Sequence, residues 1–299
     1  MNEKSKGGQS RINWYPGHMA KSLRKIEEEL KVCDAVIELC DARAPMATRD
    51  PVLKELCGSR KRLLVLNKQD LANERETARW IAYLRAQGED VTRFNSVSGR
   101  AQELVRAIED MTREKTEKAL ARGIRRTVRV MVLGIPNAGK STFINRLNGR
   151  PVAAAQDRPG VTRSVRWIRL GPYLELLDTP GMLPPRLNDQ EAAKLLAYLG
   201  SVKDGILDTE ELADSLLGVL RGIDPEGTEA RYRLSKGGDT LLEAACRGRG
   251  WLLPGGRLDT ERGSALVLDE FRAGRAGRIT LERCPAVPAG EGGEGGAGR

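Results

Sequence analysis

The chain has 299 residues, 40% hydrophobic and 30% charged, which is enough for one large or two ordinary globular domains. Its 50 Lys and Arg exceed its 41 Asp and Glu, and the net charge of +9 favours a polyanionic partner such as nucleic acid. With no apolar run of membrane-span length and no signal-peptide core, we expect a cytoplasmic protein without a membrane partner. The five scattered cysteines show no C-x-x-C spacing, which argues against a zinc site or a disulfide framework.

Strand and helix patterns alternate along the first part of the chain. A helix pattern at 19–31 precedes apolar strands at 35–40 and 62–66, an amphipathic helix that Gly88 closes, a short strand and loop at 90–99, and a helix at 100–123. A strand, a glycine-rich loop and a helix follow at 127–149, and then two strands, SVRWIRL and YLELLD. This alternation predicts an α/β fold whose largely parallel sheet is covered on both faces.

The pattern changes after Gly181. Helical periodicity recurs near 189–199, 208–221, 239–248 and 259–273, and the first convincing strand pattern is GRITLER at 277–283. We therefore expect a loose N-terminal arm at 1–11, an α/β domain at 12–185, a mostly helical domain at 186–285 and a disordered Gly/Pro-rich tail at 286–299.

The strongest motif is G-x-x-x-x-G-K-S within GIPNAGKST, which follows a strand and opens a helix. In such a P-loop, backbone N–H groups and the helix N-terminus bind phosphates, Lys140 reaches the β- and γ-phosphates, and the Ser141 hydroxyl binds Mg²⁺. We expect nucleotide contacts from the consecutive loop residues Pro136, Asn137, Ala138, Gly139, Lys140, Ser141 and Thr142.

Two further segments fit the same phosphate site. LLDTPG puts Asp178 at a strand tip, where its carboxylate can hold Mg²⁺ through water, and the Gly181 N–H can meet a γ-phosphate. Between the two motifs, RPGVTRS offers Thr162 as a switch residue whose hydroxyl joins Mg²⁺ when the γ-phosphate is present. The alternative for Thr162 is a threonine without a role.

A third group of residues matches a guanine base. In LNKQD, the Asp70 carboxylate can accept hydrogen bonds from guanine N1–H and the 2-amino group, a donor pair that adenine lacks. Asn67 would brace this loop, and the Lys68 stem would lie across the ring. The loop NSVSG can supply backbone N–H groups of Ser96, Val97 and Ser98 to guanine O6, although alone it would be read as a plain turn.

Together these motifs resemble those of the Ras-like GTPases, but in a different order. The guanine-reading loops precede the P-loop, as in the circularly permuted GTPases. The resemblance therefore implies a circularly permuted P-loop GTPase domain that is followed by the mostly helical domain.

Within that group the chain resembles the RbgA/YlqF-type ribosome biogenesis GTPases over about residues 11–205. The resemblance is carried by WYPGHMAK, DARAPMATRDP, LNKQD, GIPNAGKST, RPGVTR, DTPGML and DQEAAKLLAYLGSVKD. It implies a monomeric factor that hydrolyses GTP to GDP during late assembly of the large ribosomal subunit. It also implies that the C-terminal helical domain binds ribosomal RNA, which the basic excess of that region permits.

The position after D-x-x-G, where Ras-type GTPases carry a water-orienting glutamine, is Met182, which cannot polarise water. The resemblance supplies two substitutes. Asn137 matches an asparagine that helps to bind K⁺ in cation-dependent relatives, and His18, the only histidine, lies in the Pro-Gly-His motif that is thought to reach the nucleotide. We expect His18 and Lys140 to be catalytic; the alternative for His18 is an ordinary turn residue.

Two other functions remain open at this stage. One is a GTP-gated RNA-binding switch with negligible turnover. The other is a permuted GTPase of the small ribosomal subunit, against which the lack of an N-terminal OB-like barrel and of a terminal zinc cluster argues.

Overall fold

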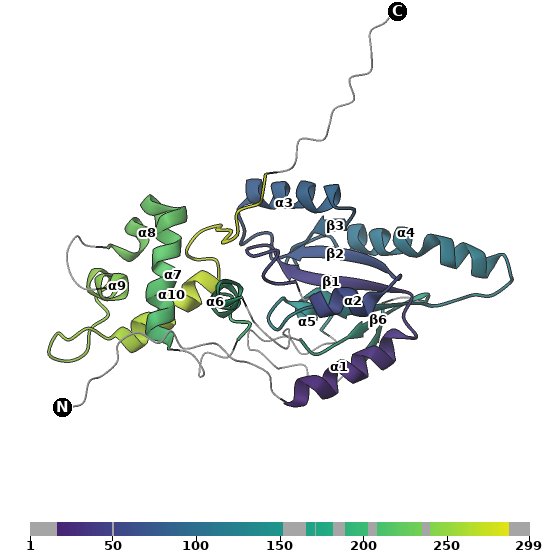
Figure 1. The fold of residues 1–299 in the computed structure, drawn as a ribbon, viewed down its shortest axis with the longest axis horizontal. Coiled ribbons are helices and arrows are strands. Elements are labelled where there is room, and N and C mark those ends of the chain that lie inside the picture. Colours follow the sequence, from purple (N-terminus) through teal and green to yellow (C-terminus); the bar gives the residue numbers. More distant parts are fainter. Residues whose placement is uncertain are drawn as a thin grey trace, which may run out of the picture.

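The computed structural model describes residues 17–49, 51–151, 166–170, 172–181, 189–202, 208–234 and 240–286, without the side chains of 17–23 and 51–53. In this part of the chain, a sheet with helices on both faces stands beside a group of helices formed by the C-terminal third (Figure 1). The predicted α/β fold with a following helical region is confirmed.

Among the described residues, the sheet has six strands in the order β3-β2-β1-β4-β6-β5, of which only the β5–β6 pair is antiparallel. Runs of Val, Ile and Leu form its centre, and all seven positions of β1 are buried, as expected of a parallel strand covered on both faces. The strands are β1 Ala35–Asp41, β2 Lys61–Asn67, β3 Asp90–Arg93, β4 Val128–Leu133, β5 Arg166–Arg169 and β6 Leu174–Asp178.

The described helices that accompany the sheet are α1 Gly17–Leu30, α2 Pro51–Cys57, α3 Glu74–Ala86, α4 Ala101–Leu120 and α5 Lys140–Asn148. Apolar residues of α4 and α5 pack on one face of the sheet, where Ile37 and Leu39 of β1 point. Residues of α1 pack with Val36, and residues of α3 pack with Cys40, on the other face. The alternation of side chains along a strand accounts for this division.

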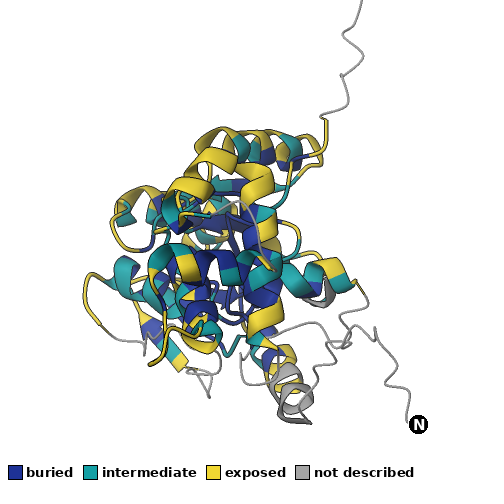
Figure 2. Ribbon diagram, turned by 90° about the vertical axis from the view of Figure 1, so that its left-hand side faces the viewer, coloured by how far each residue is buried: buried dark blue, intermediate teal, exposed yellow. Residues whose placement is uncertain are grey.

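The remaining helices are α6 Gln190–Tyr198, α7 Thr209–Ile223, α8 Pro225–Tyr232, α9 Leu241–Arg249 and α10 Thr260–Arg272. Each begins after an Asp or Thr whose side chain accepts a backbone N–H of the first turn, which stabilises the helix start. Their inward faces share one apolar core that includes Leu216, Tyr232 and Phe271. Figure 2 shows buried residues at the centre and exposed ones on the outer helices.

The structure differs from the sequence-based expectation in three places. Helices α2 and α8 were not predicted. GRITLER, expected to be a strand, forms none; the Ile279 N–H donates to Leu71 O and the Leu281 N–H to Arg43 O. Because these two acceptors lie in separate loops, no strand ladder can form. We call residues 274–284 the C-terminal segment; it runs from α10 toward α3 (Figure 1).

Candidate functional site

The expected phosphate and base motifs follow the carboxyl ends of neighbouring parallel strands. The loops after β2, β4 and β6 carry LNKQD, GIPNAGKST and DTPG, and β1 lies between β2 and β4. Carboxyl ends of parallel strands meet at one edge of a sheet, where open α/β folds bind their ligands. The described loops thus come together although the chain order is permuted.

The P-loop backbone depends on glycine. Gly139 has φ 91°, and a Cβ there would lie 2.5 Å from Asn67 Nδ2; a Cβ on Gly134 would lie 2.5 Å from Leu39 O. Lys140 opens α5, and its Nζ donates to Gly134 O at 2.9 Å and to Ile135 O at 2.8 Å. Burial lowers the pKa of Lys140 to about 8, against the attraction of Asp178. Ser141 and Thr142 follow in the first turn of α5 and are half-buried.

Asp178, the last residue of β6, lies beside this lysine. Burial raises its pKa to about 6, although Lys140 lowers it, and the buried Asp178 Oδ1 has no hydrogen-bond partner among the described residues. A buried carboxylate oxygen without a donor fits a site for a hard cation such as Mg²⁺. A Cβ on Gly181 would lie 2.6 Å from Pro136 N and 2.9 Å from Lys140 Nζ, so the D-x-x-G backbone lies directly against the P-loop.

The loop after β2, residues 67–73 (the base loop), is bonded to the P-loop. Asn67 Nδ2 donates to Ala138 O at 2.8 Å, and Lys68 Nζ donates to Asn137 O at 2.6 Å. Ser96 Oγ donates to Asn67 Oδ1 at 2.7 Å, which ties in the NSVSG loop. Asn67 thus bonds both to the P-loop and to Ser96, and Asp70 lies exposed in the turn that follows.

The NSVSG loop is stabilised by its own asparagine. Val97 N–H and Ser98 N–H both donate to Asn95 Oδ1, at 2.8 and 3.0 Å. This turn holds Val97 exposed and Ser96 buried. A guanine oxygen that approached these two N–H groups would therefore have to share them with Asn95.

Asn137 joins the P-loop to the helical region. Its φ of 60° is left-handed, and its Nδ2 donates to Gly200 O, just after α6, at 2.6 Å. Of the remaining candidates, His18 lies in the first turn of α1, where the structure describes only the backbone. Thr162 and Met182 fall outside the described residues.

Sequence reasoning assigned no role to two residues of DARAP, Asp41 and Arg43. Arg43 Nη2 lies 2.8 Å and Lys68 Nζ 3.2 Å from Asp41 Oδ2. Burial opposes ionisation of Asp41, but the charges of Arg43 and Lys68 outweigh it and hold its pKa well below its usual value. The signal available in the sequence was the aspartate that ends an apolar strand, as Asp178 does.

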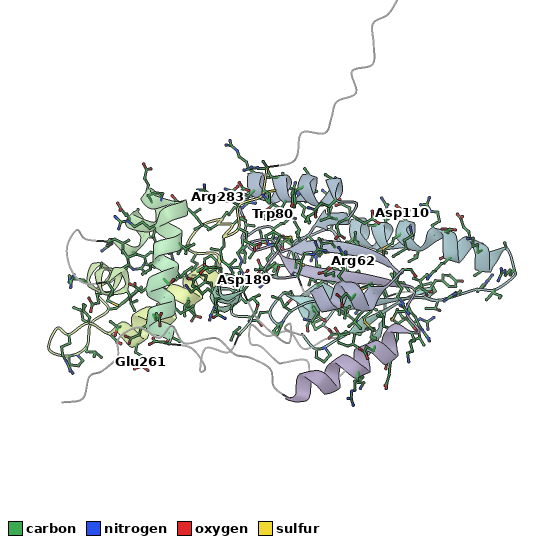
Figure 3. All side chains as sticks on the ribbon, in the orientation of Figure 1. Arg62, Trp80, Asp110, Asp189, Glu261 and Arg283 are labelled. Atoms are coloured by element: carbon green, nitrogen blue, oxygen red, sulfur yellow. The ribbon has the colours of Figure 1, made fainter. Side chains whose placement is uncertain are left out.

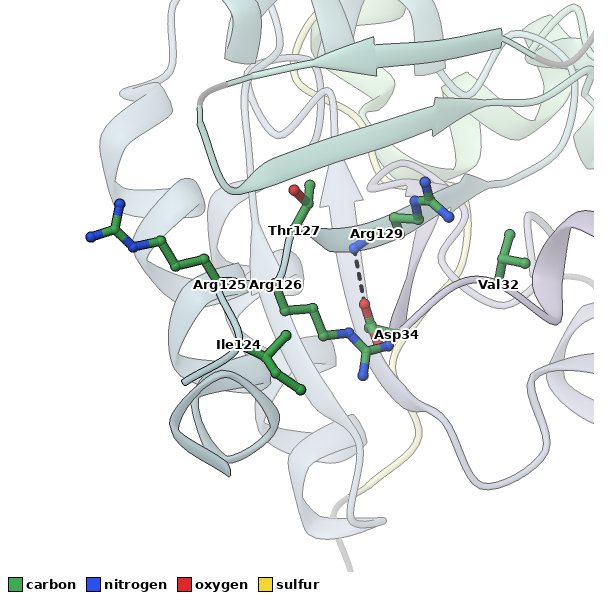
Figure 4. Close-up of a pocket in the computed structure, with 7 residues that line it drawn as sticks. All are labelled: Val32, Asp34, Ile124, Arg125, Arg126, Thr127 and Arg129. Atoms are coloured by element: carbon green, nitrogen blue, oxygen red, sulfur yellow. Dashed lines mark hydrogen bonds and ion pairs between the residues drawn. The ribbon is translucent and has the colours of Figure 1, made fainter. Parts of the chain in front are cut away.

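A pocket at the opposite edge of the sheet is distinct from these loops. It is lined by Asp34, just before β1, and by residues 124–127, just before β4; Arg126 and the Arg129 N–H both contact the Asp34 carboxylate (Figure 4). This pocket lies at the amino ends of the strands, so it does not belong to the phosphate and base site.

Comparison with known proteins gives the site its context. Residues 129–237 match the family model described as "50S ribosome-binding GTPase". The chain is 42% identical over 276 residues to Ribosome biogenesis GTPase A of Bacillus cereus, covering 91% of this chain and 93% of the relative. It is 31% identical over 274 residues to the Thermotoga maritima protein of the same name, covering 91% and 94%.

A solved structure agrees with this assignment. GDP-bound YlqF from T. maritima superposes with a TM-score of 0.64 at 27% identity, covering 87% of this chain and 99% of that one. The chain therefore belongs to the ribosome biogenesis GTPase A family, whose members are circularly permuted P-loop GTPases that hydrolyse GTP and act in ribosome assembly.

Proposed function

We propose that this GTPase acts on the large ribosomal subunit and reads guanine through Asp70. The observation that carries the proposal is that Asn67 and Lys68 of the base loop donate hydrogen bonds to backbone carbonyls of the P-loop. Because these bonds hold the two loops together, they support a site in which both loops bind the same nucleotide. The description "50S ribosome-binding GTPase" of the matched family supports the choice of subunit.

For the phosphates, we assign Lys140 and the P-loop N–H groups to the β- and γ-phosphates, and Ser141, Thr162 and Asp178 to Mg²⁺. The buried Asp178 Oδ1, for which no hydrogen-bond partner is found in the described part of the chain, supports this assignment. Bound Mg²⁺ would offset the charge of the β- and γ-phosphates. The Gly181 N–H, whose backbone lies against Pro136, is assigned to the γ-phosphate.

For hydrolysis, we assign the water-positioning role to His18 and a K⁺ site to Asn137. The Asn137 Nδ2 is engaged by Gly200 O, so its amide oxygen is the part of the side chain that can coordinate a cation. A K⁺ ion there would stabilise charge that develops between the β- and γ-phosphates.

For binding, we assign the helical region, residues 186–285, to ribosomal RNA and the α/β region, 12–185, to the nucleotide. The protein would act as a cytoplasmic monomer. The net charge of +9 supports phosphate contacts, whose strength falls as salt rises because bound Lys and Arg release counterions.

The test is GTP turnover by the full chain alone, with purified large subunits and with purified small subunits, each at low and high salt. We expect large subunits alone to stimulate turnover and to retain the protein on sedimentation, with both effects weaker at high salt. Stimulation by small subunits instead would favour the small-subunit alternative. Binding without any stimulated turnover would favour a bound switch.

A further inference from the structure

The C-terminal segment is hydrogen-bonded to the base loop on the side away from the P-loop, which we call the outer side. Ile279 N–H donates to Leu71 O at 3.1 Å. Arg278 Nε donates to Ala72 O at 3.1 Å, and its Nη2 donates to Gln69 O at 3.2 Å. Three carbonyls around Asp70 thus take their donors from residues more than 200 positions away in the chain.

Two further contacts hold the same loop. Asn73 N–H donates to Thr280 Oγ1 at 3.0 Å, and Thr280 is buried. Gly274, with φ 73°, lets the segment approach closely, since a Cβ there would lie 2.6 Å from Leu71 Cδ2. Residues 69, 71, 72 and 73 all contact the segment, so the position of the intervening Asp70 backbone depends on it.

Beyond the loop, the segment continues over α3. Trp80 Nε1 donates to Glu282 O at 3.1 Å, and Cys284 is buried in the same apolar cluster as Trp80. Figure 3 labels Trp80 and Arg283 beside each other, where the segment meets α3. The segment is therefore fixed at both ends, by α10 and by α3.

The base loop needs such support because its backbone is strained. Lys68 has φ 57°, in the left-handed region that a residue with a Cβ rarely adopts. A conformation of this kind persists only where the surroundings hold it. On the inner side, the holding contacts are those of Lys68 with Asn137 O and Asp41; on the outer side, they come from the C-terminal segment.

The helical region reaches the inner side as well. Arg43 Nη1 donates to Phe271 O and Arg272 O, each at 3.2 Å, at the end of α10. The same guanidinium pairs with Asp41, which in turn pairs with Lys68. Both sides of the base loop are thus connected to the end of α10.

We propose that the C-terminal segment is a positioning element of the guanine site, with Arg278 and Thr280 as positioning residues that set the placement of Asp70. Movement of α10 would then change guanine affinity, and guanine binding would favour the docked segment by the same factor, because coupling between two binding events is reciprocal. The proposal rests on the assignment of Asp70 as the base reader.

The test measures equilibrium affinities of the full chain for GTP and for inosine triphosphate. Inosine lacks the 2-amino group and therefore donates one hydrogen bond fewer to the Asp70 carboxylate. The variants are Arg278→Ala and Thr280→Val. The matched control is Arg275→Ala, which removes the same charge from the same segment; among the described residues, no hydrogen bond or ion pair of the Arg275 side chain is found. We expect the preference for GTP over inosine triphosphate to fall at least threefold in the two variants and to stay unchanged in the control.

A general loss of fold would lower both affinities together and leave their ratio intact, so an unchanged ratio in Arg278→Ala and Thr280→Val overturns the proposal. An equal fall in Arg275→Ala overturns it too, because charge alone would then be responsible. Asp70→Asn, tested with xanthosine triphosphate, separates the two assignments. If Asp70→Asn does not gain xanthosine affinity, the base reader itself is wrong; if it does while the ratio stays intact, only the positioning role is wrong.

Discussion

Asp178 and Lys140 are buried next to each other. Burial raises the pKa of Asp178 and lowers the pKa of Lys140, which favours the neutral form of each side chain. The pKa of Asp178 is raised from 3.8 to about 6, so the folded protein binds more protons than the unfolded chain between these values. The stabilisation that comes from protonating Asp178 in the folded protein is fully present below pH 3.8 and is lost as pH rises through about 6. The buried Asp178 carboxylate therefore destabilises the nucleotide-free fold at neutral pH.

We expect Asp178→Asn to raise the free energy of unfolding at pH 7 by about 1–3 kcal/mol, since one pKa unit corresponds to about 1.4 kcal/mol. Because asparagine does not ionise, the gain should disappear near pH 4. Urea denaturation from pH 4 to pH 8 without nucleotide measures this difference. The same gain at every pH would mean that packing, and not charge, is responsible.

Asn137 gives a prediction about cations. Wild-type turnover should be faster in KCl than in NaCl at equal ionic strength, and Asn137→Gly should remove the difference. Glycine is the appropriate replacement because it adopts the φ of 60° without strain. Steady-state GTPase assays in both salts test this, and equal wild-type rates would contradict the K⁺ assignment.

His18 gives a prediction about the chemical step. A positioned group that handles the attacking water contributes about 10²–10⁴-fold. We expect His18→Ala to reduce single-turnover hydrolysis on large subunits by that order while GTP affinity stays near the wild-type value. Rates within twofold of each other, at unchanged affinity, would leave His18 as an ordinary residue of α1.

At the scale of elements, one of the two glycines of α7 and the glycine of α10 lie in different surroundings. Gly218 is exposed in α7, and a Cβ there would meet only Leu241 Cδ1, at 3.8 Å. Gly263 is buried in α10, and a Cβ there would overlap Cys246 Sγ and lie 3.2 Å from Trp251 Cε3. The two positions separate helix propensity from packing.

We therefore expect opposite effects from the same substitution. Gly218→Ala should stabilise the protein by about 0.5–1 kcal/mol, because alanine favours helix. Gly263→Ala should destabilise it by about 1–3 kcal/mol, because the added methyl overpacks the core. Thermal unfolding of both variants beside the wild type measures the signs, and a stabilised Gly263→Ala would show that the helix core has more room than described.

The elements also show what local sequence can predict. The apolar runs at 35–40 and 62–66 become β1 and β2 within a residue at each end, because periodicity and burial are local signals. The P-loop and base loop were predictable because motif spacing encodes them. The course of GRITLER was not, since its partners Leu71 and Arg43 lie over 200 residues earlier. Arg43 shows the same limit, because its acceptors at the end of α10 leave no trace in DARAP.

At the scale of the whole molecule, the contacts of the described residues that join the helical region to the α/β region include three sets near the nucleotide loops. They are Asn137 with Gly200 O, Arg43 with the end of α10, and the C-terminal segment with the base loop. All three sit at the edge of the sheet where the strands end. A ligand that binds at that edge should stabilise both regions, because a ligand that binds only the folded state stabilises the folded structure around its site.

We expect GDP with Mg²⁺ to slow hydrogen exchange in α10 and the C-terminal segment as well as in the P-loop. The far end of α4, near residues 115–120, lies away from these contacts and serves as the internal control. Exchange measured by mass spectrometry with and without GDP tests the prediction. Protection confined to the P-loop would mean that the two regions bind and unfold independently.

The permuted strand order has a consequence for how the chain is made. Strands β1 to β3, with the base loop between β2 and α3, leave a translating ribosome first, and the P-loop strand β4 follows. The C-terminal segment, which contacts the base loop, is synthesised after α10, the last helix among the described residues. The earliest loop of the nucleotide site is thus completed by residues that are translated more than 200 positions later, so a nascent chain acquires its full set of base-loop contacts only once translation has passed residue 280.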